Sequence, residues 1–303
     1  MSHYQESRQY IDNLLEQLVV KKAPTPYLQQ ILRQIFRGGK RLRPIISLEM
    51  MKRFHETAVN SNSNYQIHRL ILIPELIHSA SLVIDDLPCM DNDTHRRDDL
   101  TIHYQYGETV AQTVVLYLLS RVYCLLYEDL ELLEQHQLPS FQQRRTLILS
   151  CLSRNLGVTG AAHGQYLDTL QLPSNPILAS QSQDGVRSQL KELLVKKTAT
   201  FFELSFVISY LALGGELTCL EDIKEMSTNF GLAFQISDDF EDQESDSKRP
   251  FCPNYVNHTG IKESLTSFNH HIQQCKDALV KYNLDTPTYH EIFQLIQARV
   301  PSQ

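Results

Sequence analysis

Two groups of aspartates end apolar segments that lie far apart in the chain. The first segment, Ser81 to Arg97, reads SLVIDDLPCMDNDTHRR: two carboxylates close an apolar stretch, two more follow Pro88, and two arginines end the segment. The second segment, Phe234 to Asp242, reads FQISDDFED. Its polar residues recur at intervals that place them on one face of a helix; they are Gln235, Asp238, Asp239 and Asp242.

Either acidic group taken alone is also typical of a solvated helix face. Together they indicate a binding site, if the fold brings them to one cavity. Two carboxylates about 4 Å apart repel by about 4 kcal/mol at an effective dielectric constant of about 20, so a larger group needs cations. Oxygen-only ligands select Mg²⁺ or Ca²⁺, and Mg²⁺ commonly binds substrate phosphates as well. The pattern therefore predicts a phosphorylated substrate bridged by Mg²⁺.

Basic residues near the amino end could bind such a substrate. The segment Phe36 to Pro44 reads FRGGKRLRP and places Lys40, Arg41 and Arg43 after two glycines at a predicted helix boundary, where an anion is well accommodated. Ordinary surface charge is the alternative interpretation. His78 precedes Asp85 by two helical turns and so shares its face, although a histidine in the core would show the same spacing.

The sequence predicts that these residues lie on or next to helices. Apolar residues recur every three or four positions, as in Phe201, Leu204 and Ile208, and alternating strand patterns are scarce. Turn-forming residues divide the chain into about nine or ten helices, with breaks at 23–26, 38–39, 88, 138–139, 173–176 and 245–253. We therefore expect an all-α fold, one large helical bundle around a central cavity, with residues 1–303 as a single domain.

Composition narrows the class of protein. Of the 303 residues 42% are hydrophobic, and the formal charge is −7, which disfavours nucleic acid as a partner. The amino end lacks the pattern of an export signal. The most apolar run, Val114 to Tyr127, is interrupted by Arg121 and is too short to span a membrane. Six scattered cysteines show no metal or redox spacing. We expect a soluble cytoplasmic protein with reduced thiols.

Five motifs in order identify a family resemblance. GGKRLRP is followed by DDLPCMD with RR, then by GQYLD, by KT and by GLAFQISDDFED. In this combination the chain resembles the trans-prenyl diphosphate synthases, the farnesyl and geranylgeranyl diphosphate synthases. The resemblance extends from about Pro24 to about Gly260, and beyond it only the helical character matches.

The resemblance implies a role for each matching residue. Asp85, Asp91 and Asp238 would hold Mg²⁺ on the allylic diphosphate, supported by Asp86, Asp239 and Asp242. The allylic substrate would contact four residues, Arg96, Lys197, Thr198 and Gln235. Isopentenyl diphosphate would contact four others, Lys40, Arg43, His78 and Arg97. The catalytic residues would be Asp85, Asp86, Asp238, Asp239 and Lys197.

The chemistry implied is ionisation followed by condensation. Mg²⁺ and cationic side chains stabilise the departing diphosphate, so that an allylic carbocation forms and the alkene of isopentenyl diphosphate attacks it. No nucleophilic side chain is needed. Water must be excluded, which suits an apolar cavity. A homodimer is expected from the resemblance alone.

A small residue upstream of the first acidic motif bears on product length. In the family, side chains at this place limit the growing prenyl tail, and farnesyl synthases often carry an aromatic residue where this chain has Ala80. The resemblance therefore favours a twenty-carbon product, geranylgeranyl diphosphate, with farnesyl diphosphate as the alternative. A small residue that merely eases helix packing is an equally open interpretation.

The chain departs from the family pattern at several positions. Asp98, Asp99 and Leu100 follow the arginine pair in place of a usual glycine and proline, and Val115 and Leu116 replace a Gly-Asp pair. The loop after the second motif is short, and Cys252 stands where a lysine is common, a loss that Lys248 could offset. Because of these departures, a weakly active subunit that modulates another synthase is an alternative interpretation. A terpene cyclase is a third interpretation, but a cyclase would not need GGKRLRP or Arg97, which serve a second diphosphate.

Overall fold

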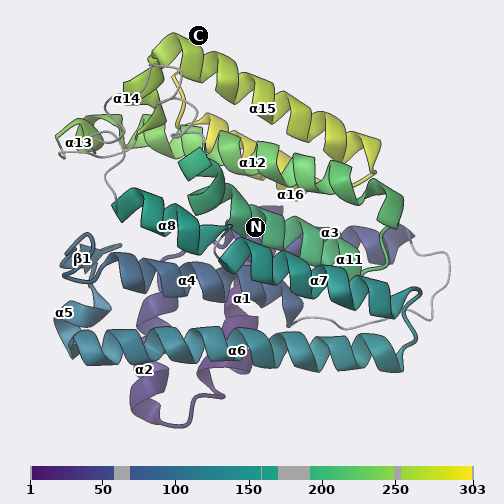
Figure 1. The fold of residues 1–303 in the computed structure, drawn as a ribbon, viewed down its shortest axis with the longest axis horizontal. Helices are drawn as coiled ribbons and strands as arrows, with labels where there is room; N and C mark the ends of the chain where they lie inside the picture. The colour runs from purple at the N-terminus through teal and green to yellow at the C-terminus, as the bar shows by residue number, and fades with distance from the viewer. Residues whose placement is uncertain (1, 58–68, 158, 170–191, 249–253, 302–303) are drawn as a thin grey trace. The chain divides into compact units, whose positions relative to one another are not determined.

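The computed structural model describes residues 2–57, 69–157, 159–169, 192–248 and 254–301. The chain divides into two compact units, Met1–Gln142 and Gln143–Gln303. Almost all regular structure in the described residues is helical (Figure 1), as the sequence predicts. The single-domain assignment stays a prediction.

The first unit is built mainly from helices that surround α4. Its elements are α1 His3–Leu15, η1 Glu16–Val20, α2 Pro26–Phe36, α3 Leu42–Thr57, η2 Leu70–Leu72, α4 Ile73–Asp85, β1 His95–Arg96, β2 Asp99–Leu100, α5 Ile102–Tyr106 and α6 Glu108–Gln135. Helices α4 and α6 run side by side (Figure 1), and α4 also contacts α2 and α3. Helix α4 carries the first acidic motif at its carboxyl end, so the core of the unit holds that end in place.

Capping residues and prolines define the helix ends in this unit. The Thr25 side chain accepts a hydrogen bond of 3.2 Å from the Leu28 amide, and proline occupies the first turn of α2, where its missing N–H has no cost. Helix α4 ends at Asp85 just before Pro88, which cannot continue a helix. The predicted breaks at 38–39, 88 and 138–139 are confirmed as gaps between helices, and the break at 23–26 ends where α2 begins at Pro26. The break predicted at 173–176 lies outside the described residues. The break predicted at 245–253 is wrong for residues 245–247, which are helical, and residues 249–253 lie outside the described part of the chain.

The second unit is a set of helices around α12. Its elements are α7 Phe141–Leu156, which begins at the boundary, α8 Ala161–Thr169, η3 Val195–Ala199, α10 Thr200–Glu203, η4 Leu204–Ile208, α11 Ser209–Ala212, η5 Leu217–Cys219, α12 Leu220–Glu241, α13 Gln243–Ser247, α14 Tyr255–Thr259, α15 Ile261–Lys281 and α16 Pro287–Gln297. Helix α15 lies along α12 (Figure 1), and η3, α10 and α16 also contact α12. The second acidic motif is thus part of the central helix of its unit.

A cluster of buried aromatic rings holds the second unit together. The Phe230 ring lies 4.8 Å from that of Phe202, 5.8 Å from that of Phe206 and 6.0 Å from that of Phe293, measured between ring centroids. All four side chains are buried. Such pairs add to the stabilisation from apolar burial. The cluster joins α12 to α10, η4 and α16, so it fixes the helix that carries Asp238.

Two features of local structure were not predicted. Residues 95–100 form a two-stranded antiparallel hairpin in which His95 pairs with Leu100 and Arg96 with Asp99. Three helical segments, η1, η3 and η4, are π-helical turns. Such turns are recurrent at functional sites, and η3 contains Lys197 and Thr198. The hairpin turns at Arg97 and Asp98, both with positive φ, and such a turn is hard to predict where no glycine is present.

Helix α6 contains the apolar run that the sequence shows near Arg121. By length and composition it is the one helix among the described residues that could cross a membrane. Arg121 donates a hydrogen bond of 2.9 Å to the Leu18 carbonyl, and Asp129 accepts hydrogen bonds from the amides of Arg69 and Leu70. These polar contacts and the packing along α4 are those of a helix within a folded unit.

Candidate active site

The carboxyl end of α4 presents the first acidic motif. Asp85 is the last residue of the helix and is half-buried, and Asp91 is exposed. The Asp91 amide donates a hydrogen bond of 2.9 Å to the Asp85 carbonyl, which folds the chain back onto the helix end. The turn therefore brings the backbones of these two predicted metal ligands together, although six positions separate them in the sequence.

Asp86 has a different environment from Asp85. Its side chain is buried, and its Oδ1 accepts from Nε of Arg96 at 2.7 Å and pairs with Nη2 of Arg96 at 2.6 Å. Arg96 lies in β1, so this ion pair ties the hairpin to the end of α4. In the opposite strand Asp99 pairs with Arg37, the residue that follows α2, at 2.9 Å. The supporting role that the resemblance implies for Asp86 stays a prediction, and the ion pair with Arg96 is compatible with it.

A pocket opens beside this ion pair within the first unit. It lies between α2, α4 and the hairpin, and charged side chains of both signs share it with apolar ones. Its lining residues are Gln34, Ile35, Arg37, Ser79, Leu82, Val83, Asp86, Arg96, Arg97, Asp99, Leu100, Thr101 and Ile102. The predicted substrate residues Arg96 and Arg97 thus border one concavity.

The GGKRLRP segment divides its basic residues between surface and core. Lys40 is exposed, whereas Arg43 is buried at the start of α3. Arg41 is also buried and pairs with Glu75 at 2.7 Å and with Asp12 at 2.8 Å. Arg41 therefore stabilises the unit, and Lys40 and Arg43 are the two residues of this motif that the resemblance assigns to substrate.

The glycines of that segment accommodate Arg97. The Arg97 Nη1 donates a hydrogen bond of 3.3 Å to the Arg37 carbonyl. A side chain at Gly39 would put its Cβ 1.9 Å from Nη1 of Arg41 and 3.1 Å from Nη1 of Arg97. Glycine is thus needed where two guanidinium groups approach the backbone.

His78 is a neutral histidine in a basic environment. Burial lowers its pKa well below the usual value, and the positive charges of Arg43, Arg97, Arg96 and Arg41 lower that pKa further. The imidazole is therefore uncharged near pH 7 and can donate or accept one hydrogen bond. His78 was predicted to share the face of Asp85, and the charges that act on its pKa are those of these four arginines. Its role in substrate binding stays a prediction.

Asp239 is the buried carboxylate of the second motif. Its Oδ1 accepts from Nε2 of Gln235 and its Oδ2 from the Tyr255 amide, both at 2.7 Å. The Asn254 side chain donates to the Asp239 carbonyl at 2.8 Å. Burial raises the pKa of Asp239 to about 7, although the hydrogen bonds from Tyr255 and Gln235 oppose this shift. Asp239 thus ties α12 to the start of α14.

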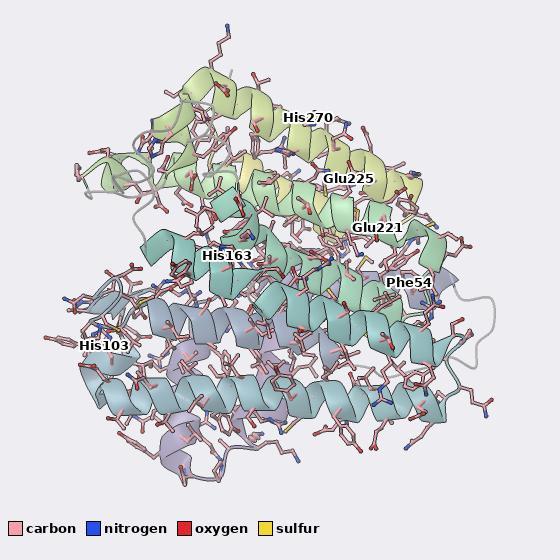
Figure 2. The ribbon with its side chains drawn as sticks, viewed as in Figure 1. Phe54, His103, His163, Glu221, Glu225 and His270 are labelled. Carbon is pink, nitrogen blue, oxygen red and sulfur yellow. The ribbon has the colours of Figure 1, made fainter. Side chains whose placement is uncertain are left out.

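Gln235, Thr198 and Lys197 come together in the second unit. The Thr198 hydroxyl donates to Oε1 of Gln235 at 2.5 Å, and the Lys197 ammonium pairs with Asp168 of α8. Nearby, Nζ of Lys196 lies 3.2 Å from Nδ1 of His163, which is labelled on α8 in Figure 2. Three residues that the resemblance assigns to the allylic substrate therefore share one region.

Two glycines permit the close approach of the helices there. A Cβ on Gly164 of α8 would lie 2.8 Å from the Lys197 amide nitrogen, and a Cβ on Gly231 of α12 would lie 2.5 Å from the Ala199 Cα. Both contacts are with backbone, which cannot move aside cheaply. Segment η3 is therefore held between α8 and α12, and this position sets where Lys197 and Thr198 lie.

Asp168 was not predicted as a partner of Lys197, although it is part of the GQYLD motif. A signal was present, because Gly164 and Asp168 are four positions apart and share a helix face. The face that lets η3 approach at Gly164 also carries the acid that binds Lys197.

Asp238 has a cationic partner that the sequence did not indicate. Arg299, just after α16, pairs through Nη1 with Oδ1 of Asp238 and through Nε with Oε2 of Glu241 at 3.3 Å. Asp238 is partly exposed, and Asp242 is exposed at the end of α12. No sequence motif predicts the contact between Arg299 and Asp238, because 61 positions separate the two residues and the contact depends on how α16 packs.

The structure thus gathers the predicted residues within each unit. The first unit holds Asp85, Asp86, Asp91, Arg96 and Arg97 around one end of α4, and the second holds Lys197, Thr198, Gln235 and Asp239 around η3 and α12. The joint use of both acidic motifs stays a prediction. In the part of the chain that the structure describes, no three or more His, Cys, Asp or Glu residues form a ready metal cluster. Two carboxylates with water and substrate phosphates are what Mg²⁺ typically uses.

The departures from the family pattern have mixed consequences. Leu116 is 68% exposed, so its replacement of an aspartate changes the surface and not a cavity wall, while Val115 is buried. Lys248 pairs with Glu244 at 2.8 Å on an exposed helix face. Cys252 lies outside the described residues.

The sequence matches one protein family over most of its length. The family model described as "Polyprenyl synthetase" matches residues 25–250. A trans-prenyltransferase of African swine fever virus is 26% identical over 262 residues, which are 86% of this chain and 72% of that protein. The heterodimeric geranylgeranyl pyrophosphate synthase large subunit 2 of Arabidopsis thaliana is 30% identical over 241 residues, 78% of this chain and 58% of that protein.

A solved structure shares the fold. The geranyltransferase of Helicobacter pylori matches with a TM-score of 0.71 and 25% sequence identity, over 97% of this chain and 96% of that chain. The match extends past Gly260, where the sequence motifs end. The all-helical fold expected from the sequence is therefore confirmed.

Proposed function

Because this chain belongs to the polyprenyl synthetase family, we propose that it condenses isopentenyl diphosphate with an allylic diphosphate in a magnesium-dependent reaction, with geranylgeranyl diphosphate as product. The chain is a transferase that acts on isoprenyl diphosphates. The observation that carries the finer proposal is the pairing, within each unit, of an acidic helix end with the basic and polar residues that a diphosphate needs. Farnesyl diphosphate synthase is the alternative.

The donor atoms available suit Mg²⁺. Asp85, Asp91 and Asp238 offer carboxylate oxygens, which are the ligands that Mg²⁺ prefers. The backbone hydrogen bond of 2.9 Å between Asp91 and Asp85 brings two of these residues to one turn. Bound there, Mg²⁺ would neutralise charge on the departing diphosphate. Asp86 and Asp239 are engaged by Arg96 and Gln235, and they would orient the site without binding the metal.

Cationic side chains of this chain would also bind the allylic diphosphate and stabilise its departure. Lys197 and Arg96 carry positive charge, and Thr198 and Gln235 form a hydrogen-bonded pair. Their acidic partners, Asp168 and Asp86, orient the two cations before substrate binds. Preorganised positive charge lowers the barrier to ionisation of the carbon-oxygen bond.

The isopentenyl diphosphate would be held by the basic cluster of the first unit. Lys40, Arg43 and Arg97 supply charge, and His78 supplies a neutral hydrogen-bonding group because its pKa is low. A neutral imidazole adds no charge beside the nearby arginines and can donate its one N–H to a diphosphate oxygen. The diphosphate released from the allylic substrate would take the final proton, as the family resemblance implies.

The proposed product length depends on Ala80. This residue is buried in α4, less than two turns before Asp85. A small side chain there would leave room for a twenty-carbon tail. Replacement by phenylalanine, Ala80→Phe, should shorten the product to fifteen carbons if this wall limits the tail, and should leave product length unchanged if Ala80 only eases helix packing.

We also propose a homodimer formed through α6. Its surface carries three large apolar side chains on one face, with Leu116, Tyr123 and Tyr127 exposed by 68%, 60% and 61%. A second copy would cover this face and remove apolar surface from water. Sedimentation of wild type should give a dimer, and Leu116→Lys with Tyr123→Lys should give a monomer. Association only with a different synthase would favour the regulatory-subunit alternative.

The cytoplasm is the location we propose. Cys89 and Cys124 are exposed thiols, and none of the five cysteines described in the structure is in a disulfide, as in reducing compartments. Fractionation of cells that express the full chain tests this, because recovery in a membrane or secreted fraction would contradict it.

The function is tested by product identification. Purified protein is incubated with Mg²⁺, isopentenyl diphosphate and each allylic starter, and the dephosphorylated products are separated by chromatography. We expect a twenty-carbon alcohol that is lost in Asp85→Ala and on removal of Mg²⁺ by chelation. The absence of product with every starter would favour the regulatory subunit.

A further inference from the structure

Arg299 is bound to the second acidic motif by two ion pairs and one cation–π contact. Its guanidinium pairs with Oδ1 of Asp238 and, at 3.3 Å, with Oε2 of Glu241. It also lies over the ring of Phe234, with Cζ 5.3 Å from the ring centroid. All three partners belong to α12, so one arginine from the end of the chain covers the segment that the sequence marks as a metal site.

The side chain of Arg299 is well enclosed for a charged group. It is 9% exposed, against 29% for Asp238 and 52% for Glu241. Arginine is seldom buried unless it is paired, and a guanidinium stacked on an aromatic ring gains further from that contact. This burial indicates a defined binding place for the arginine and not a passing surface contact.

The neighbouring aspartate of the motif, Asp239, is engaged within the unit. Both of its oxygens accept hydrogen bonds, from Gln235 and from the Tyr255 amide. Asp238 is the residue of this motif that the resemblance assigns to the metal, and its Oδ1 is the atom that Arg299 holds. Two cations on one carboxylate repel each other, so the arginine opposes metal binding there.

We propose that Arg299 is an internal counter-ion that occupies Asp238 until a divalent metal binds and displaces it. This inference rests on the proposed use of Asp238 as a metal ligand. It adds that metal binding releases the residues after α16 from α12. These residues would therefore be bound to α12 when the site lacks metal and released when the site holds metal. Before loading, Arg299 offsets part of the negative charge of Asp238 and Glu241.

Metal binding tests the proposal directly. Mn²⁺ is titrated into the full-length protein in the presence of inorganic diphosphate, and the free ion is followed by electron paramagnetic resonance. Arg299→Gln should bind Mn²⁺ about fivefold more tightly than wild type, which corresponds to about 1 kcal/mol. Arg299→Lys keeps the charge but loses the two-point contact, and should lie between them.

A matched control is Arg154→Gln, in the same unit. Arg154 pairs with Glu203 and does not contact α12 through that pair, so its loss should leave Mn²⁺ binding unchanged. If Arg299→Gln binds Mn²⁺ no more tightly than Arg154→Gln, the proposal is overturned. Asp238→Asn tests separately whether Asp238 is a metal ligand at all. Unchanged Mn²⁺ binding in that variant would refute the proposed metal site itself, whatever the role of Arg299.

Hydrogen exchange supplies a second readout that does not depend on activity. Mass spectrometry follows the amides of residues 294–300 with and without Mn²⁺ and diphosphate. In wild type the metal should speed exchange there, because Arg299 leaves α12. In Arg299→Gln the same amides should already exchange fast without metal, and the addition of Mn²⁺ should not change their exchange rate. Metal-induced protection of these amides in wild type would contradict the displacement.

Discussion

The side-chain amide of Gln235 donates a hydrogen bond of 2.7 Å to Oδ1 of Asp239, one turn further along α12. The oxygen of the same amide accepts from Thr198 at 2.5 Å. Gln235 therefore connects η3 to the buried carboxylate of the second acidic motif. Removal of this one amide would leave a buried carboxylate oxygen and a hydroxyl group short of a partner.

We expect Gln235→Leu to lower the free energy of unfolding by about 1–3 kcal/mol, the cost of a buried polar group left without its hydrogen bond. Denaturant unfolding measures it. Gln273→Leu is the matched control, because Gln273 makes the same bond to Asp277 at 2.8 Å on an exposed face. An equal loss of stability in both variants would show that the hydrogen bond of Gln235 stabilises the fold no more than the exposed one of Gln273.

Loss of the ion pair between Asp86 and Arg96 should cost more stability and more activity than loss of the ion pair between Asp99 and Arg37. Asp86→Asn should cost about 1.5–3 kcal/mol of stability, as for hydrogen bonds to charged groups. Turnover should fall about tenfold or more as Arg96 loses its orientation. Asp99→Asn, which removes the more exposed pair with Arg37, should cost less than about 1 kcal/mol. Similar kinetics for the two variants would argue against a positioning role for Asp86.

Buried Arg144 predicts a large loss of stability in a part of the chain away from the acidic motif. Its guanidinium donates to the carbonyls of Gly215 at 2.8 Å, Gly214 at 3.2 Å and Leu211 at 3.3 Å, which closes the end of α11. Arg144→Met should lower the free energy of unfolding by about 1–3 kcal/mol, because buried carbonyls lose their donor. The exposed neighbour supplies the control: Arg145→Met should change it by less than about 0.5 kcal/mol.

The low pKa of His78 predicts how stability depends on pH. In the unfolded chain the imidazole binds a proton near its ordinary pKa of about 6.5, whereas in the fold it stays neutral. The unfolded state therefore binds more protons below that pH, and stability falls as the pH drops from 7 to 5. His78→Gln should show a smaller fall over this range. His270→Gln, on α15 (Figure 2) and exposed, should behave as wild type.

Much of the fold was predictable because its determinants are local. The helix breaks at Pro88 and at Gly38 follow from backbone chemistry, and the face shared by Gln235 and Asp239 follows from helix periodicity. The π-helical turn at Lys197 was not predictable, since it reflects the approach of α8 and α12 at two glycines. Arg299 and Arg144 were missed for the same reason: their partners are distant in the sequence, and no spacing indicates them.

The most direct test of the central claim is the release of inorganic diphosphate by the wild-type protein with Mg²⁺. We predict one diphosphate released for each isopentenyl diphosphate consumed, only when an allylic diphosphate is also present, and a loss of this release in Asp238→Asn. Release of diphosphate from the allylic diphosphate alone would instead indicate a cyclase or a hydrolase that removes the whole diphosphate group. No release with both substrates present would contradict the proposal that this chain is an active synthase.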